Sequence, residues 1–500
     1  MEKHLKTNYG STEPQKSKTI ENLRRAKEEE CRMEGTVSGC PFRTKFHIMP
    51  SVGWMNDPNG LCQFQGIFHV YFQYSPLNVH GGGGYWGHCT SRDLLHWEYQ
   101  DPVLTTDIPE DRSGVYSGSA LCEHGKMYLF YTGNVKLPGD YDYTDSGRIS
   151  SQLMVESTDG QQMSGKKLLL GMEDYPRQIT AHVRDPKVWK EGEDYFMILG
   201  ARERGTTEDS DGKRLDKGGV LIYRSKDMRN WKFHREIMPE TPFGYMWECP
   251  DLFDLDGERI LSFCPQGLKT EAERFQNVYQ SGYSLLSKSG DPEKTFTEWD
   301  MGFDFYAPQT FLSEDGRRIL IGWAGVPDTE NTHRNLSVVN GWQHCLTLPR
   351  ELSLHNGNVF QKPVRELYDL EWKEAEISRG RFDWSGRTVR LEMSEIDKSP
   401  REVKVMVGSE NNGLTIQIKG DRTELSFLGN GTKAECGGGR ERRIGHTEGP
   451  VRDLTVLIDS SIVEIFVNGG ERVFTTRIYL KKEERELLVE GSGTFRVFTV

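Results

Sequence analysis

The chain has 500 residues and a formal net charge of −12, and 35% of its residues are hydrophobic and 11% aromatic. A chain of this length can bury a large core and predicts more than one domain, and the abundance of Tyr, Phe and Trp favours β-structure. The acidic balance, without a basic stripe, argues against nucleic-acid or membrane partners, and no apolar run approaches the ~18 residues of a membrane helix.

Residues 1–45 form a charged N-terminal segment. Its start lacks the apolar core and cleavage site of a signal peptide, so we expect a cytoplasmic protein. Residues 16–32 carry Ile20, Leu23 and Ala26 at roughly helical spacing, which predicts a short surface helix. The nine cysteines include no CxxC pair and no zinc-like spacing with histidine. Reduced thiols are the simplest account, and Cys249 is expected to be a small buried hydrophobe.

The stretch WMNDPNG at residues 54–60 is the first with a distinct chemical character. Pro58 fixes its own φ and biases Asp57 towards an extended conformation, while the following Asn-Gly pair tolerates positive φ. An apolar, aromatic strand is expected at residues 66–74. We therefore expect a stiff turn that holds the Asp57 carboxylate at the mouth of a sheet. The alternative is an Asx-turn that only shapes a loop.

Five loosely similar units of strands and turns follow one another between about residues 46 and 350. The clearest internal match is between residues 91–97 (SRDLLHW) and 225–231 (SKDMRNW). The units open at Asn56-Asp57-Pro58, Tyr116-Ser117-Gly118-Ser119, Arg184-Asp185-Pro186, Cys249-Pro250-Asp251 and Tyr306-Ala307-Pro308. A period of roughly 50–65 residues is that of propeller blades. Residues 46–350 are therefore predicted to form a five-bladed β-propeller.

In a propeller, equivalent positions of the units meet around one axis. The unit openings carry Asp57, Asp185 and, just ahead of the fourth, Glu248. Three carboxylates in one pocket are costly unless function or a cation holds them there. The alternative to a catalytic role at this point is a calcium site or a set of solvated turn acids.

The pattern changes after about residue 350, where residues 351–363 are predicted as a linker. Residues 364–500 contain period-two alternation, as in 402–407 (EVKVMV) and 462–467 (IVEIFV). That alternation predicts antiparallel strands packed as a β-sandwich, with a hairpin turn at residues 468–470 (NGG). We expect an all-β protein whose second domain braces the first.

Two carboxyl groups in one pocket are what glycoside hydrolysis requires, because one attacks or stabilises the anomeric carbon and the other protonates the leaving oxygen. Asp57, among amide neighbours, is suited to stay ionised. Glu248 follows Tyr-Met-Trp and precedes Cys-Pro, an apolar setting that would raise its pKa and keep a proton available. Arg184 can hold an acid ionised or grip hydroxyls. Flat apolar faces of the kind that pack on sugar rings are offered by Trp54, Trp86 and Trp323.

Three segments, 54–60 (WMNDPNG), 184–186 (RDP) and 248–250 (ECP), resemble the signature boxes of the invertase family of glycoside hydrolases, the β-fructofuranosidases. Further matches lie at 72–76 (FQYSP), 86–88 (WGH), 117–119 (SGS), 305–309 (FYAPQ), 322–325 (GWAG) and 459–470. The matches run in order through both predicted domains, and three acid boxes with flanking matches form a specific signature. The resemblance implies a five-bladed propeller with a C-terminal β-sandwich.

The resemblance also implies a role for each acid. Asp57 would be the nucleophile that forms a covalent fructosyl-enzyme, Glu248 the general acid and then base, and Asp185 the transition-state stabiliser. The sugar pocket would be lined by Trp54, Asn56, Gln73, Trp86, Ser117, Gly118, Arg184, Tyr306 and Trp323. Configuration would be retained, with the catalytic carboxyls ~5–5.5 Å apart. No metal or organic cofactor is implied, and the partner is a small sugar.

Within the family, an intracellular chain of this layout is most similar to the bacterial sucrose-6-phosphate hydrolases, so sucrose 6-phosphate, sucrose or both are the expected substrates. An intracellular exo-β-fructosidase acting on fructan oligomers is the alternative, and transfructosylation stays open. An inverting five-bladed glycosidase would place its carboxyls ~6.5–9.5 Å apart. A carbohydrate-binding propeller would lack the nucleophile or the acid, and a pure interaction propeller would not need three acids with pocket tryptophans. A homodimer through a sandwich face is left open.

No phosphate-binding box is recognisable. The candidate cations, chosen for their expected place in loops, are Arg148, His182, Arg202, Arg204, Arg274 and His333. For each of them a solvated surface residue is the simpler interpretation. The acceptor side of the pocket is expected to be set by loops such as residues 140–145 (DYDYTD).

Overall fold

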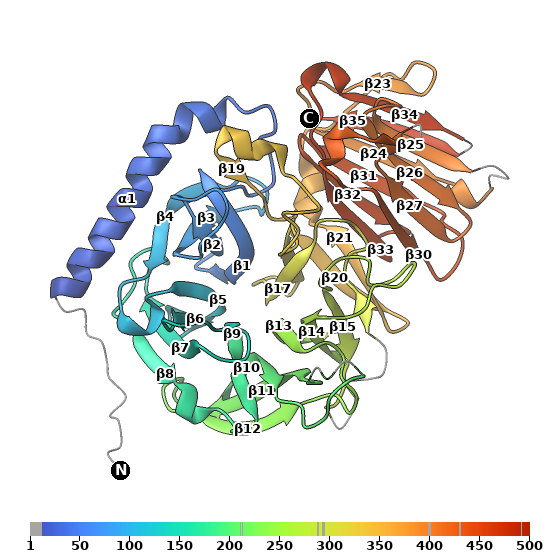
Figure 1. Ribbon diagram of the computed structural model, residues 1–500. Coiled ribbons are helices and arrows are strands. Elements are labelled where there is room, and N and C mark those ends of the chain that lie inside the picture. The colour runs from blue at the N-terminus through green and yellow to red at the C-terminus, as the bar shows by residue number, and fades with distance from the viewer. Residues whose placement is uncertain are drawn as a thin grey trace, which may run out of the picture.

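A long helix, α1 (Glu13–Ser38), lies along one side of the β-structure (Figure 1). The computed structural model describes residues 13–210, 212, 214–287, 290–292, 296–398, 402–429, 432–491 and 493–500. The helix extends beyond the predicted 16–32 at both ends, and residues 1–12 of the expected N-terminal segment lie outside the described residues.

Polar contacts hold α1 against the first sheet. Ala26 is fully buried, but Ile20, which the helical spacing placed on the apolar face, is 67% exposed. Asn22 Nδ2 donates to Thr105 Oγ1 (3.0 Å), and Glu30 Oε1 accepts from Tyr74 OH (2.8 Å). The helix is therefore docked by hydrogen bonds at least as much as by an apolar stripe.

Five sheets surround a common axis and form a β-propeller (Figure 1). The first sheet contains β1 (Gly53–Phe64), β2 (Ile67–Ser75), β3 (Tyr85–Ser91), β4 (Glu98–Thr105) and, beside β1, β19 (Trp342–Gln343). The second contains β5 (Gly114–Glu123), β6 (Lys126–Lys136), β7 (Arg148–Ser157) and β8 (Lys167–Leu170). The third contains β9 (Ile179–Glu191), β10 (Asp194–Glu203), β11 (Lys217–Ser225) and β12 (Lys232–Ile237).

The fourth sheet contains β13 (Met246–Leu255), β14 (Glu258–Gln266), β15 (Gly282–Leu285) and β16 (Thr297–Glu298). The fifth contains β17 (Tyr306–Leu312), β18 (Arg318–Trp323), β20 (Arg350–His355) and β21 (Asn358–Pro363). Residues 351–363, predicted as a linker, are therefore the outer strands of the fifth sheet, and that prediction is wrong. The fifth sheet needs four strands to cover its neighbours, and β18 pairs directly with β20.

The innermost strands β1, β5, β9, β13 and β17 contact one another in sequence, and β17 contacts β1. The short strand β19, which lies in the chain between β18 and β20, pairs in parallel with β1 and ties the last unit to the first. The repeat seen in the sequence corresponds to equivalent turns. Asp93, Asp159 and Asp227 each follow the third strand of a sheet, and each accepts two backbone N–H groups of the turn.

Every innermost strand carries a shift in its pairing register with the second strand of its sheet, at the corresponding position in each unit. The shifts fall at Met55/Pro58, Val115/Gly118, Arg184/Lys187, Glu248/Asp251 and Tyr306/Gln309. Such bulges leave residues without a pairing partner and re-aim their side chains. The WMNDPNG stretch is thus part of β1, and not the turn ahead of a strand that its Pro-Asn-Gly sequence suggested. The bulge bends the chain while the strand continues through it.

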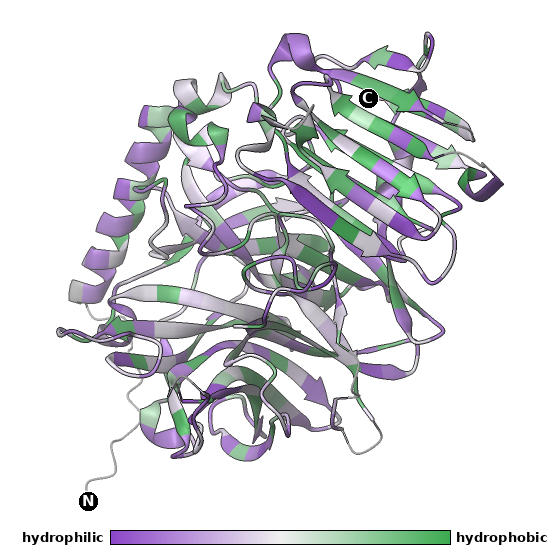
Figure 2. Ribbon diagram, turned by 45° about the vertical axis from the view of Figure 1, so that its right-hand side comes forward, coloured by the Kyte–Doolittle hydropathy of each residue, from purple (hydrophilic) through white to green (hydrophobic). Residues whose placement is uncertain are grey.

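The second domain is a sandwich of two six-stranded sheets. One contains β22 (Lys373–Glu374), β35 (Thr494–Thr499), β24 (Val389–Ser394), β31 (Leu454–Asp459), β32 (Ile462–Val467) and β33 (Arg472–Arg477). The other contains β23 (Arg381–Asp383), β34 (Glu486–Glu490), β25 (Val403–Gly408), β26 (Gly413–Lys419), β27 (Arg422–Ser426) and β30 (Arg442–His446), and a separate pair joins β28 (Leu428–Gly429) to β29 (Thr432–Lys433). Green and purple residues alternate along these strands in Figure 2, as the period-two pattern predicted. The predicted hairpin at residues 468–470 joins β32 to β33.

A buried ionic network joins the two domains. Arg350 of the fifth sheet places Nη2 2.7 Å from Glu464 Oε2 and Nη1 3.2 Å from Asp300 Oδ2, and all three side chains are fully buried. His47, at the start of the propeller, contacts Asp459 (2.7 Å) and Glu464 (2.9 Å) of the sandwich. Buried charges persist only when they are paired in this way. The sandwich therefore braces the propeller from the side, as expected.

Candidate active site

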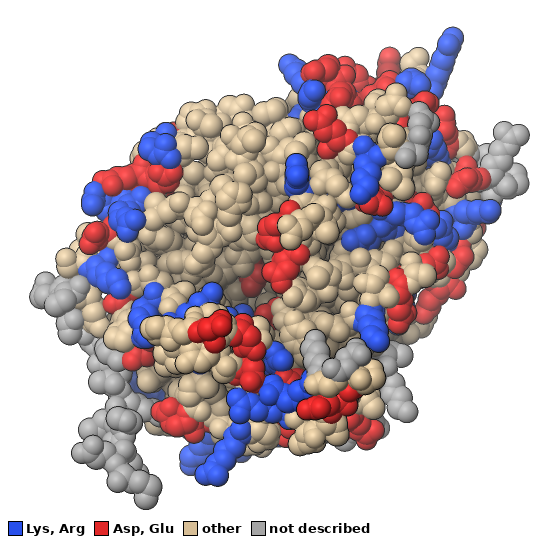
Figure 3. All heavy atoms as spheres, in the orientation of Figure 1, with Lys and Arg blue, Asp and Glu red and all other residues tan. Residues whose placement is uncertain are grey.

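A cavity of about 400 Å³ opens at the propeller axis. Figure 3 shows it as the hollow near the middle of that face, with both acidic and basic side chains along its border. The bulges of the innermost strands supply its floor, so residues far apart in the chain meet there. Of the predicted site residues, those that line it are Trp54, Asn56, Asp57, Gln73, Ser117, Arg184, Asp185, Glu248, Tyr306 and Trp323.

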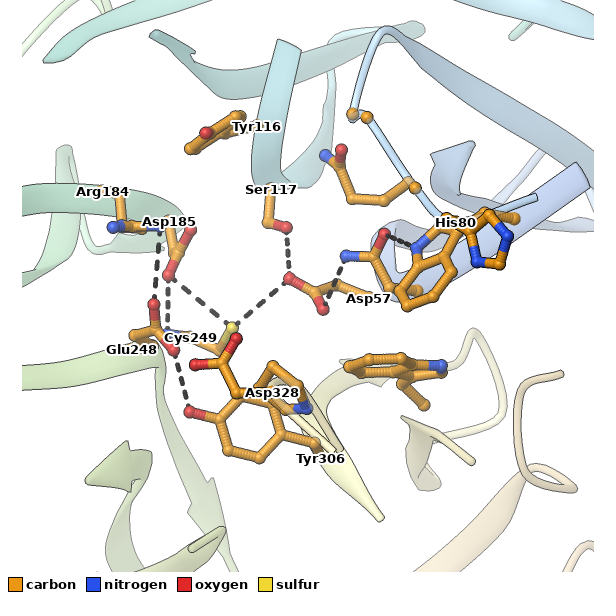
Figure 4. A pocket seen from close by; sticks show the side chains of 18 of the residues that line it. Asp57, His80, Tyr116, Ser117, Arg184, Asp185, Glu248, Cys249, Tyr306 and Asp328 are labelled. Carbon is orange, nitrogen blue, oxygen red and sulfur yellow. Dashed lines mark hydrogen bonds and ion pairs between the residues drawn. The ribbon is translucent and has the colours of Figure 1, made fainter. Parts of the chain in front are cut away.

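The Asp57 carboxylate is held by neutral donors. Ser117 Oγ donates to Oδ2 (2.5 Å) and Asn56 Nδ2 donates to Oδ1 (3.1 Å), and Asn56 is itself fixed by Trp54 Nε1 (2.8 Å) (Figure 4). Burial raises the pKa of Asp57, and the hydrogen bonds from Ser117 and Asn56 oppose that rise because they favour the charged form. The sequence suggested a polar, ionising environment. The structure adds burial, whose effect on the pKa of Asp57 those two donors only partly offset.

Glu248 lies across the cavity with stronger polar contacts than its apolar flanks in the sequence suggested. Tyr306 OH and Gln266 Nε2 both donate to Oε2 (2.8 Å each), and Arg184 Nη1 is 3.5 Å from Oε1. Burial raises the pKa of Glu248, while the Arg184 charge and the Tyr306 hydrogen bond moderate the rise. A carboxyl with a raised pKa can hold a proton for a leaving group.

Asp185 completes the set of three acids. It adopts a left-handed backbone conformation (φ 63°) at the bulge of β9, and Cys249 N donates to its Oδ2 (2.9 Å). Burial and the charges of Glu248 and Asp57 raise its pKa to about 7, against the opposing charge of Arg184. A positive φ in a residue other than glycine costs conformational free energy, and folded proteins often carry such strain at functional sites. The φ of Cys249 (48°) and Ala307 (47°), at the equivalent bulges, is also positive.

Comparison with known proteins shows the family of the chain. A family model described as the N-terminal domain of glycosyl hydrolases family 32 matches residues 47–363, and the corresponding C-terminal model matches residues 404–500. The chain belongs to glycosyl hydrolase family 32. This family 32 enzyme is 35% identical to the sucrose-6-phosphate hydrolase of Bacillus subtilis over 486 residues, which is 94% of this chain and 96% of the relative. It is 34% identical to a raffinose invertase of Escherichia coli, over 88% of this chain and 90% of the relative.

Solved structures give the same architecture. The sucrose-6-phosphate hydrolase of Lactobacillus gasseri superposes on the family 32 enzyme with a TM-score of 0.80 and 26% identity, covering 94% of this chain and 95% of the other. A mutant of the Bombyx mori family 32 β-fructofuranosidase in complex with sucrose gives a TM-score of 0.76 and 28% identity, covering 96% and 97%.

Two of the predicted pocket residues of this family 32 enzyme do not line the cavity. Trp86 is fully buried, and its Nε1 donates to Tyr116 O (3.1 Å), because β3 is the third strand of its sheet and stands well away from the axis. Gly118 lies deeper in the axial channel, where its N–H donates to Asn59 Oδ1 (3.2 Å). Trp86 instead supports Tyr116, which was expected only as the first residue of a unit opening and lies in the cavity wall.

Aromatic side chains form one wall. The rings of Trp54 and Trp323 are 5.9 Å apart, and His344 packs edge-on against both, at 4.3 and 4.9 Å. Such faces suit the apolar side of a sugar ring. His344 was not predicted, because nothing in its local sequence signals that it packs behind two tryptophans.

Cys249 does more than fill space. Its Sγ lies 3.8 Å from Asp57 Oδ2 and 3.7 Å from Asp185 Oδ2, between the two carboxylates (Figure 4). A hydrogen bond with Cys264, burial and the neighbouring acids raise the pKa of the thiol well above its usual range, so it stays neutral and can donate weakly. The expectation of a buried hydrophobe is therefore incomplete.

Other wall residues were also missed. Gln266 holds Glu248 from the end of β14, and Lys136, Asp328 and Glu330 lie along the cavity wall. None belongs to a motif, and only the folding of the chain brings them to the site. All nine cysteines are free thiols. Among the described residues no three His, Cys, Asp or Glu side chains gather as metal ligands, and no helix is long and apolar enough to cross a membrane.

Proposed function

We propose that the protein is a retaining β-fructofuranosidase that hydrolyses sucrose 6-phosphate, sucrose or both, giving fructose and glucose or its 6-phosphate. One observation carries the proposal. Two carboxyl groups of unlike environment face one cavity, Asp57 held by the neutral donors Ser117 and Asn56 and Glu248 held by Tyr306, Gln266 and the Arg184 cation. Pairs of acids whose surroundings differ in this way divide the roles of nucleophile and proton donor.

In the first step Asp57 attacks the anomeric carbon of the fructosyl unit, while Glu248 gives its proton to the glycosidic oxygen as that bond breaks. In the second step Glu248 takes a proton from water, which attacks the same carbon and releases Asp57. Asp185 binds fructose hydroxyls as charge develops on the ring, and Arg184 stays paired with Glu248. The charges balance without a metal ion or an organic cofactor.

The retaining and inverting alternatives differ in the spacing of these carboxyls, and we propose ~5–5.5 Å, the separation typical of retention. The relatives' names favour sucrose 6-phosphate and sucrose over fructans. Nine free thiols fit a reducing compartment, and we place the enzyme in the cytoplasm. A small sugar is its partner.

Comparison of kcat/KM for sucrose, sucrose 6-phosphate and a short inulin oligomer tests the proposal. We expect turnover of the two sucrose compounds to exceed that of inulin at least tenfold. Equal or better activity on inulin would make the protein a fructan exo-hydrolase. An absence of activity on all three would refute the proposed function and favour a carbohydrate-binding propeller.

A further inference from the structure

Two cations at one wall of the cavity, Lys136 in its lining and Arg148 beside it, have no ion-pair partner among the described residues. Lys136, the last residue of β6, lines the cavity, and it stands directly opposite Arg148, the first residue of β7. Like charges directly opposite one another on neighbouring strands are destabilising. In the described part of the chain neither forms an ion pair, and aromatic rings lie against both, Tyr143 at 5.4 Å from Lys136 Nζ and Tyr116 at 5.8 Å from Arg148 Cζ. The charges of Glu248 and Asp185 act on Arg148 only from beyond ion-pair distance.

Arg148 is the more unusual of the two. Its Nε and Nη1 atoms are buried and make no hydrogen bond with any described residue. Burial and the neighbouring Arg184 charge lower the pKa of Arg148 to about 10. His182, beside them, is buried with both ring nitrogens unpartnered among the described residues, and burial and the same cations lower its pKa, so it stays neutral. This wall therefore holds positive charge at a cost to the unliganded protein.

The other candidate cations are paired with acids or lie away from the cavity. Arg202 pairs with Asp216 (2.7 Å), Arg204 with Asp145 (3.4 Å) and Arg274 with Glu298 (3.4 Å). Two of the three acids of the 140–145 loop are also engaged, because Asp145 binds Arg214 (2.6 Å) and Asp142 accepts backbone N–H groups of its own turn. His333 packs against Phe303, where the junction with the sandwich begins. Within the described part of the chain Arg148 and Lys136 remain as the cations without an ion pair at this wall, and Arg148 lies in β7 rather than in the loop expected.

The position of these cations relates them to the leaving group. Arg184 contacts Glu248 (3.5 Å), and Arg184 and Arg148 face the same Tyr116 ring, at 5.5 and 5.8 Å. The cationic wall thus begins at the proposed proton donor and runs outwards to Lys136. In Figure 4, Tyr116 and Arg184 lie on the Glu248 side of the cavity. Because Glu248 protonates the leaving oxygen, the leaving sugar must lie against this wall.

We propose that Arg148 and Lys136 form a subsite for the phosphate of the leaving glucose 6-phosphate, and so set the preference for sucrose 6-phosphate over sucrose. The inference rests on the proposed function, and it names the substrate determinant of the same cavity. A guanidinium fork and an ammonium group are the donors that bind a phosphate dianion most strongly. Bound phosphate would relieve the repulsion between them.

The test uses Arg148→Gln and Lys136→Met, singly and together, in the full-length enzyme. A charge-assisted hydrogen bond to phosphate contributes roughly ten- to a hundredfold in affinity. The ratio of kcat/KM for sucrose 6-phosphate to that for sucrose should therefore fall about tenfold or more in each variant, and further in the double variant. Arg224→Gln and Lys126→Met, which remove cations paired with Asp194 and Glu156 away from the cavity, are the matched controls and should leave the ratio unchanged.

Calorimetric binding of glucose 6-phosphate, glucose and inorganic phosphate separates this inference from the proposed function. We expect the enzyme to bind glucose 6-phosphate at least tenfold more tightly than either of the others, and Arg148→Gln to abolish that advantage. If both sucrose compounds are hydrolysed but the substitutions leave the ratio and the binding unchanged, the subsite is wrong and the function stands. If neither compound is hydrolysed but glucose 6-phosphate still binds through Arg148, the function is wrong and the subsite stands.

Two further outcomes bear on the same inference. Inorganic phosphate that binds as tightly as glucose 6-phosphate would overturn the assignment to a leaving sugar and indicate a site for the free anion. The melting temperature gives an independent readout, because Arg148→Gln removes a buried, unpaired cation and should not lower the stability of the unliganded enzyme. A large loss of stability together with retained glucose 6-phosphate binding would contradict the account of this wall.

Discussion

Replacing Tyr306 by phenylalanine removes one hydrogen bond to Glu248 and keeps the ring in place. The hydroxyl donates to Oε2 at 2.8 Å in a buried site, and a hydrogen bond to a charged group contributes about 1.5–3 kcal/mol. At 1.36 kcal/mol for each pKa unit, its loss corresponds to about 1–2 units. We expect the lower end, because Gln266 still donates to the same oxygen.

The direction of the pKa shift of Glu248 follows from the protonation state that the Tyr306 hydroxyl stabilises. A donor favours the ionised carboxylate, so its removal raises the pKa of Glu248 further above the usual range. The proton donor must be protonated to act, and activity falls as pH rises through its pKa. The basic limb of the kcat/KM profile for sucrose should therefore move about one unit towards higher pH in Tyr306→Phe.

Tyr279→Phe is the matched control for this experiment. The Tyr279 ring lies 6.4 Å from the Tyr306 ring. The Tyr279 hydroxyl donates to Asp328 Oδ2 (2.7 Å) and not to Glu248. The basic limb of the kcat/KM profile of Tyr279→Phe should stay at the wild-type pH. A basic limb that does not move in Tyr306→Phe, or that moves to lower pH, would refute Glu248 as the titrating proton donor.

Four further results are expected. Asp57→Asn should lower kcat by roughly 10⁴-fold or more with an unchanged melting temperature, and normal turnover would disprove its role as nucleophile. Glu248→Gln should lose the basic limb yet spare fructosides with good leaving groups, whereas equal losses on both kinds of substrate would speak against an acid/base role. Arg350→Met should destabilise the protein by about 3–5 kcal/mol in denaturant unfolding, because the fully buried Asp300 loses the cation paired with it and the fully buried Glu464 keeps only His47 as an ion-pair partner; Arg381→Met, at an exposed pair, should change stability little. Prolonged incubation with a chelator should leave activity intact, and a marked loss would reopen the calcium interpretation of the acids.

The acids could be predicted because they belong to a repeat. Asp57 and Asp185 lie within the bulges of two innermost strands and Glu248 directly precedes the bulge of a third, and a propeller brings these bulges together around its axis. The bulges themselves could not be read from the sequence, since Pro-Asn-Gly is more typical of a turn. The structure resolves that conflict by bending a continuous strand at each proline or glycine.

Residues outside the motifs could not be predicted in the same way. Gln266 reaches Glu248 and Lys136 reaches the cavity because each ends a strand that runs towards the site, and their local sequence carries no sign of this. Trp86 shows the opposite error. It belongs to a motif and was predicted to line the pocket, but it lies in the third strand of its sheet, away from the axis. The alternation in residues 351–363 is that of two strands, yet the change of pattern near residue 350 favoured a linker. A homodimer through a sandwich face stays a prediction.

The stereochemistry of the first product tests the central claim most directly. With methanol added as a competing acceptor, a retaining enzyme that forms a fructosyl-Asp57 intermediate should yield methyl β-fructofuranoside from sucrose, as seen by NMR. Brief reaction followed by acid quenching and peptide mass analysis should then find one fructosyl unit on the peptide that contains Asp57. Formation of the α-anomer, with no modified Asp57 peptide, would contradict the covalent mechanism and favour an inverting glycosidase.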